Sequence, residues 1–146
     1  MKLHRIIPIL ALLLFTSLNA DAQCKAFAKN YCLPLLESYT HDGNYHAAML
    51  VVGEEAELYK TFYSDMEYRV AICGEENLPN IEFLIIDANR NILYSNKDNN
   101  YSKTWDFKLQ SSQQLRLVIK VGTPRQPASA PASGCVSIMF GLRAIK

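Results

Sequence analysis

The sequence has 146 residues, of which 15 are basic, 14 are acidic and 49% are hydrophobic. A chain of this length supports one domain with its own hydrophobic core. The charges nearly balance and are mixed along the sequence, so it lacks the basic surface by which proteins bind nucleic acid or an anionic membrane.

The first 22 residues have the pattern of a secretory signal peptide. Lys2 and Arg5 precede an apolar run over residues 6–18, which is shorter than the roughly 20 residues that a transmembrane helix needs. Small residues follow, and they predict cleavage after Ala22, with cleavage after Ala20 as the alternative. Removal of residues 1–22 takes away two basic residues and one acidic residue, so the mature chain is neutral. We expect a secreted or periplasmic protein without a transmembrane segment.

Residues 23–44 form the next predicted unit, a helical segment followed by a turn. Good helix formers occupy the run from Cys24, and Pro34 predicts a kink or an end of the helix because it disfavours the helical conformation at Leu33. The composition of residues 41–44, His-Asp-Gly-Asn, is typical of a turn.

Residues 45–146 are predicted to form an antiparallel β-sandwich, so that the fold class is mainly β and jelly-roll-like. About eight short runs with strand character follow one another, with turn signals between them and connections too short for parallel crossovers. The expected strands are 45–52, 57–63, 67–73, 81–87, 91–95, 104–110, 115–121 and 135–142. The strand 81–87 is almost wholly apolar, which is typical of a strand covered on both faces. The segment 123–134 is rich in Pro, Ala and Ser and predicts an exposed, mobile loop.

Four cysteines, Cys24, Cys32, Cys73 and Cys135, all lie in the mature chain. In an oxidising compartment they predict two disulfides, although four cysteines allow three pairings. Alternation along their strands places Cys73 and Cys135 on the outer face of a sheet. Cys24 and Cys32 would lie about 12 Å apart along a helix, which is too far for a disulfide. We therefore expect each of them to pair with Cys73 or Cys135, tethering the helix to the sheet; the alternative pairs Cys24 with Cys32 and Cys73 with Cys135.

No motif in the sequence indicates catalysis, a cofactor or a strong metal site. There is no nucleophile elbow, no phosphate-binding glycine loop and no Cys-x-x-Cys pair, and His41 and His46 have no third ligand nearby. Asp87, Asn89 and Asn91 offer oxygens at alternate positions and are weak calcium candidates. Their composition fits a hairpin turn better.

Exposed aromatic side chains are the remaining binding feature. Trp105 falls on the predicted core face, whereas Tyr59 and Tyr63 alternate with Leu58 and Phe62 and are predicted to lie on the surface. Exposed aromatics stack on sugars or anchor a protein partner.

From Glu57 to Leu142 the order of features resembles the bacterial pre-peptidase C-terminal (PPC) type of domain, a jelly-roll-like β-sandwich. The matching runs are Tyr59–Tyr63, Tyr68–Ile72, Phe83–Asp87 with Asn91–Tyr94, Trp105–Phe107, Leu115–Ile119 and Cys135–Ile138. The sequence departs from that family at Ser64-Asp65, where the family commonly turns on glycine, in its cysteines and in its N-terminal segment. The mature chain also resembles small secreted proteins of Bacteroidetes-type bacteria. The resemblance implies a protein that binds or assists, with no catalytic residue carried over.

The sequence therefore predicts an exported, non-catalytic protein that binds a glycan or a protein partner at the cell surface or outside the cell. A structural envelope protein without a small ligand is the alternative, and an enzyme of unrecognised type is the third hypothesis.

Overall fold

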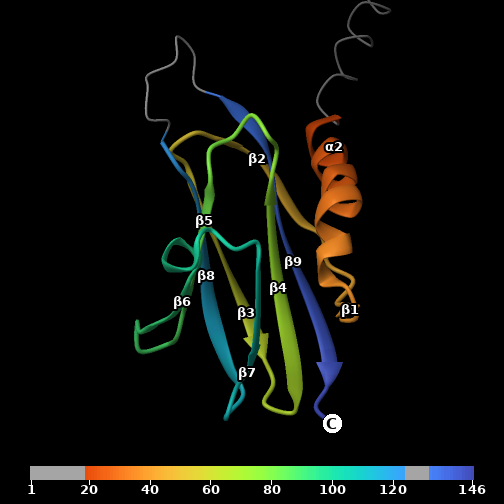
Figure 1. Ribbon diagram of the computed structural model, residues 1–146, viewed down its shortest axis with the longest axis vertical. Helices are drawn as coiled ribbons and strands as arrows, with labels where there is room; N and C mark the ends of the chain where they lie inside the picture. The colour runs from red at the N-terminus through yellow and green to blue at the C-terminus, as the bar shows by residue number, and fades with distance from the viewer. Residues whose placement is uncertain (1–18, 124–131) are drawn as a thin grey trace, which may run out of the picture.

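The computed structural model describes residues 19–123 and 132–146. The described chain folds into two antiparallel sheets packed face to face, with the N-terminal segment lying against one of them (Figure 1). The predicted antiparallel β-sandwich is thus confirmed. Residues 1–18 of the predicted signal peptide and residues 124–131 of the predicted mobile loop lie outside the described residues.

One sheet, called the covered sheet below, has the strand order β1-β9-β4-β7, and β2 also pairs with β9. The other, the uncovered sheet, has the order β3-β8-β5-β6. The strands are β1 Thr40–His41, β2 His46–Val51, β3 Glu55–Phe62, β4 Met66–Gly74, β5 Ile81–Ile86, β6 Ile92–Ser95, β7 Thr104–Lys108, β8 Gln113–Val121 and β9 Ser133–Ala144.

The core lies between the sheets and follows the predicted alternation. Side chains at every second position of β4, β8 and β9 are nearly fully buried there, together with Phe62, Phe83 and Phe107. Trp105 packs against this core while partly exposed, and it stacks between Tyr94 and Phe107 with ring centroids 4.6 Å and 4.5 Å away. Leu84 is an exception to the expected double cover of β5. It is only half-buried, since its neighbours Phe83 and Ile85 fill the core.

The N-terminal segment packs on the outer face of the covered sheet. It comprises α2 (Asn19–Phe27), a π-helical turn (Ala28–Cys32) and a 3-10 turn (Leu33–Leu36). Helical structure ends two residues after Pro34, but Leu33 keeps a helical backbone (φ −54°, ψ −41°), so the expectation that Pro34 excludes this conformation at Leu33 is wrong. A second apolar cluster forms beneath it, in which Ala28, Cys32 and Leu36 meet Ala71, Cys73 and Met139 from β4 and β9. The cysteines face outward on the sheet because this segment covers them.

Two disulfides fasten the segment to the sheet. Cys24 bonds Cys135 and Cys32 bonds Cys73, with Cα atoms 5.2 Å and 5.7 Å apart. The predicted tether is confirmed, and the alternative pairing of Cys24 with Cys32 is wrong.

The ends of the predicted strands lie within two residues of those in the structure, and two of the differences reflect pairing with β9. Thr40 and His41 form β1, where a turn was expected to begin at His41, because they pair with Leu142 and Gly141 of the long strand β9. β9 itself begins at Ser133, inside the expected loop, because residues 133–138 pair with β2. Within the described ranges, no helix combines the length and the apolarity needed to cross a bilayer.

Candidate functional site

β2 and β3 lie at the edges of the two sheets and follow each other in the chain, joined by the turn at residues 52–54. In the described part of the protein each pairs with one strand, β2 with β9 and β3 with β8. The gap between these two edges opens the sandwich interior to solvent, and a cavity of about 210 Å³ lies there.

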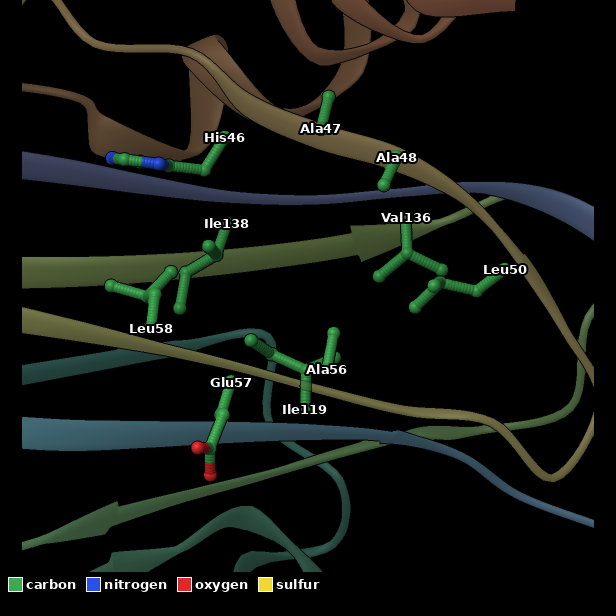
Figure 2. Close-up of a pocket in the computed structure, with 10 residues that line it drawn as sticks. All are labelled: His46, Ala47, Ala48, Leu50, Ala56, Glu57, Leu58, Ile119, Val136 and Ile138. Carbon is green, nitrogen blue, oxygen red and sulfur yellow. The ribbon is translucent and has the colours of Figure 1, made fainter.

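We call it the β2–β3 cavity, and its walls are almost wholly apolar (Figure 2). The short side chains of Ala48 and Ala56, on opposite edges, leave the space into which Leu50, Ile119 and Val136 point. The complete lining is His46, Ala47, Ala48, Leu50, Ala56, Glu57, Leu58, Ile119, Val136 and Ile138. The Glu57 carboxylate points away from the other lining side chains (Figure 2).

A polar cluster lies beside His46, one of the residues that line the cavity. The Lys60 Nζ atom of β3 lies 2.8 Å from the Asp42 carboxylate, in the loop between β1 and β2, and the Asp42 side chain is 8% exposed. The backbone N–H of Asn44 donates to the same carboxylate at 2.9 Å. His46 packs edge-on against Phe140, with ring centroids 5.6 Å apart. The ion pair thus joins the two sheet edges beside His46.

The charge states in this cluster follow from burial and from the ion pair. Burial alone raises the pKa of Asp42, but the hydrogen bonds from Lys60 and Asn44 outweigh it and hold the pKa below its ordinary value. Burial lowers the pKa of His46, although the nearby Asp42 carboxylate acts in the opposite direction. The ion pair therefore favours the ionised form of Asp42, and burial favours the neutral form of the His46 imidazole.

Tyr59 and Tyr63 are both on the surface, 58% and 57% exposed. Tyr59 lies on the outer face of the uncovered sheet, opposite Arg116 of β8, and Tyr63 follows the last residue of β3. Tyr59, Arg90, Ile92 and Arg116 line a hollow of about 580 Å³, together with Ile86, Asp87 and Ala88. We call Tyr59, Arg90, Ile92 and Arg116 the Tyr59 surface.

The Tyr59 surface adjoins the β2–β3 cavity through β3. Glu57, which lines the cavity, lies 3.6 Å from the guanidinium of Arg116, which lines the hollow. Ala56 and Leu58 line the cavity while Tyr59 faces the hollow. One strand therefore borders both features.

The weak calcium candidates form a hairpin turn between β5 and β6. The Asp87 carboxylate accepts hydrogen bonds from the backbone N–H groups of Asn89 and Asn91, at 2.9 Å and 2.8 Å, and from the Asn91 amide at 2.9 Å. These bonds lower the pKa of Asp87. Within residues 19–123 and 132–146, no three His, Cys, Asp or Glu side chains gather as metal ligands.

The sequence reasoning missed the β2–β3 cavity and the cluster beside it. The spacing of His41 and His46 gave no reason to place them together, yet both lie beside Asp42. The sequence does show the small residues that leave space for the cavity, which are the run Ala47-Ala48 in one predicted strand and Ala56 near the next. Small residues become informative only once their strands are known to be facing edges.

No family model matches the chain, and no curated protein matches it. Among solved structures the chain is similar to PliG of Aeromonas hydrophila, a periplasmic inhibitor of g-type lysozyme. The two share 11% sequence identity with a TM-score of 0.51, and the match covers 73% of this chain and 90% of that chain. At this identity the similarity shows the fold alone. The resemblance to the PPC type of domain stays a prediction.

Proposed function

We propose that this protein is an exported, non-catalytic β-sandwich that binds a protein partner outside the cytoplasm through the Tyr59 surface. The observation that carries the proposal is an exposed tyrosine beside two arginines and the 61% exposed Ile92 on the uncovered sheet. Tyrosine and arginine are enriched among residues that dominate protein interfaces, and an exposed apolar group beside them adds area to bury.

Two further observations support it. Two disulfides in a domain of this size are typical of an oxidising compartment. The fold is shared with a periplasmic protein that inhibits another protein, g-type lysozyme. We therefore propose a lysozyme of that type as the first partner to test.

The test uses the oxidised protein comprising residues 23–146. We expect it to bind g-type lysozyme in calorimetry and to slow cell-wall lysis. Tyr59→Ala should weaken binding roughly 30-fold, the loss typical of an interface residue worth about 2 kcal/mol. Tyr31→Ala is the matched control, because Tyr31 is 66% exposed and lies in the N-terminal segment that covers the other sheet.

Two further binding measurements are made: lysozyme with the Tyr63→Ala variant, and soluble peptidoglycan fragments with the wild-type protein. Binding of lysozyme that is unchanged in Tyr59→Ala and Tyr63→Ala would contradict the proposed surface. Binding of the fragments instead of the enzyme would favour the glycan hypothesis. Binding of neither would leave a structural envelope role as the better explanation.

A further inference from the structure

The two disulfides are nested along the sequence. The first of the four cysteines bonds the fourth and the second bonds the third, so the Cys24–Cys135 bond spans the Cys32–Cys73 bond. These bonds join residues that are 111 and 41 positions apart. Cys24 and Cys32, in contrast, are eight positions apart and bond to different partners. The native pairing therefore passes over the two cysteines that are closest in the sequence.

Chain entropy favours a bond between Cys24 and Cys32 in the unfolded protein. The probability that two positions of a flexible chain meet falls with about the 3/2 power of their separation. On this basis Cys24 meets Cys32 roughly fiftyfold more often than it meets Cys135, and Cys32 meets Cys24 roughly tenfold more often than it meets Cys73. A chain that enters an oxidising compartment from its N-terminus has the same bias, because Cys24 and Cys32 arrive first and Cys135 arrives last.

The contacts that select the native pairs form only with the last strand. β9 carries Cys135 and pairs with β1, β2 and β4. The N-terminal segment packs through Ala28 and Leu36 on a surface to which β4 contributes Ala71 and β9 contributes Met139. This surface is complete only when β9 has joined β4, so the segment cannot dock before then. Until it docks, the contacts that hold Cys24 and Cys32 apart are not formed.

A bond between Cys24 and Cys32 excludes the native cover of the sheet. The helical segment places these residues about 12 Å apart, whereas a disulfide needs Cα atoms within roughly 7 Å. Cys73 and Cys135 are then left together on the bare outer face. In the register of β4 and β9, Cys73 faces Ser137, so Cys135 is its diagonal neighbour, at roughly 7–8 Å between Cα atoms. A small shift of the two strands brings them within bonding distance, and the mispaired chain then has no free thiol with which to rearrange.

Burial protects the native bonds and leaves the mispaired ones open to attack. Cys24, Cys32 and Cys135 are fully buried in the folded protein, and Cys73 is 6% exposed. Thiol–disulfide exchange requires that a thiolate reach one of the bonded sulfurs. In the mispaired chain the N-terminal segment does not cover the sheet, so an external thiolate can reach the bonds. Exchange therefore ends at the native pairing.

We propose that the native disulfides arise by rearrangement of a chain paired Cys24–Cys32 and Cys73–Cys135, and that this protein is a substrate of a thiol–disulfide isomerase in the compartment where it folds. The inference does not depend on binding to lysozyme.

The rearrangement needs three exchange steps. The isomerase thiolate attacks the Cys24 sulfur, which forms a mixed disulfide and releases the Cys32 thiolate. Cys32 attacks the Cys73 sulfur, which forms the first native bond and releases the Cys135 thiolate. Cys135 attacks the Cys24 sulfur of the mixed disulfide, which forms the second native bond and returns the isomerase thiolate. Two disulfides are present before and after, so no oxidant or reductant is consumed.

The first experiment follows the pairing in reduced residues 23–146. Diamide, an oxidant that is not itself a thiol, oxidises the protein. N-Ethylmaleimide blocks the remaining thiols at successive times, and tryptic peptides are mapped by mass spectrometry. Trypsin cuts after Lys25 and Lys29, between Cys24 and Cys32, so each pairing gives its own linked peptides. We expect the Cys24–Cys32 link to appear first and to persist.

The second experiment adds a reduced thiol–disulfide isomerase to the mispaired protein in a glutathione buffer. We expect the native pairs to form roughly tenfold faster than in the buffer alone. Native pairs that form directly in diamide, without a Cys24–Cys32 link, would overturn the inference. Conversion at equal rates with and without the isomerase would overturn the assignment of the partner.

Cys24→Ala/Cys135→Ala is the matched control, because it retains Cys32 and Cys73 and no cysteine with which either can mispair. We expect its bond to form in diamide with the same yield with and without the isomerase. The measurement detects the linked peptide and not the folded state, so a less stable variant still gives a result. An isomerase effect of equal size in the control and the wild type would also overturn the inference, since the control has no wrong bond to rearrange.

Discussion

Arg69 joins three parts of the molecule through one guanidinium group. It donates to both carboxylate oxygens of Asp106 on β7, at 2.7 Å and 2.8 Å, and to the carbonyl of Leu35 at 3.2 Å. It also lies 2.9 Å from the Glu37 carboxylate and over the Tyr39 ring. The planar fork of arginine matches this geometry, which a single ammonium group does not.

Arg69→Lys is therefore expected to lower the free energy of unfolding by about 1–3 kcal/mol, because the bidentate bonds to Asp106 are lost. Arg116→Lys is the control: the Arg116 side chain is 41% exposed and makes one ion pair at 3.6 Å, so its substitution should change stability by less than about 0.5 kcal/mol. Urea unfolding measures both, and equal effects would contradict the role given to Arg69.

Asp42 makes the stability depend on pH. Its pKa is held below the ordinary value, so its ionised form favours the folded state. That contribution is complete above the unfolded pKa of 3.8 and is lost as the pH falls through the lower folded pKa. Asp42→Asn should destabilise the protein by about 1–2 kcal/mol at about pH 7 and by less at about pH 3.

Urea unfolding at the two pH values measures the difference. Asp98→Asn, at an exposed position, is the control and should leave stability unchanged at both. A penalty for Asp42→Asn that is equal at both pH values would contradict the importance of the ion pair.

At the scale of the elements, the alternation of apolar and polar side chains along single strands predicts most of the fold, including which face of each strand lies in the core. In β4 the sequence Tyr68, Val70 and Ile72 alternates with Arg69 and Cys73, and a strand with one face in a core must alternate in this way. The same alternation places Cys73 and Cys135 on the outer face of the sheet. It therefore predicts that the N-terminal segment covers this face and is joined to it by disulfides. These features depend on local order along one strand.

The features that the sequence did not predict depend on which strands are neighbours. β1 has two residues and no strand pattern of its own, and it exists because it pairs with β9. The β2–β3 cavity needs two alanines on facing edges, and the polar cluster needs a loop that brings Asp42 to Lys60. Contacts between residues distant in sequence set these features, and no local pattern encodes them.

Removal of the disulfide between Cys32 and Cys73 tests whether this bond holds the N-terminal segment against the sheet. It closes a sequence separation of 41 residues, for which the loop-entropy estimate is about 4 kcal/mol. In Cys32→Ala/Cys73→Ala we expect faster amide exchange in residues 28–36, because one fastening point is gone, while β8 stays protected in the core. Exchange in residues 28–36 that matches the wild type would show that packing alone holds the segment.

At the scale of the whole molecule, the predicted signal-peptide cleavage site lies inside a helix of the structure. α2 spans Asn19–Phe27 and therefore crosses the predicted cleavage site, with Cys24 two residues beyond Ala22. We expect the exported protein to begin at Gln23, and intact-mass measurement should show a gain of about four hydrogens on reduction of its two disulfides. A mass that places the first residue at Asp21 would instead support cleavage after Ala20.

The bond between Cys24 and Cys135 has a topological consequence. It joins positions 111 residues apart in the sequence. Every residue between these cysteines lies inside one covalent loop, whereas residues 136–144 of β9 lie outside it and are held by their pairing with β1, β2 and β4. One cut by a protease between these cysteines leaves a single covalent molecule. While that bond lasts, a nick between Cys24 and Cys135 does not release the fragment that carries the N-terminal segment.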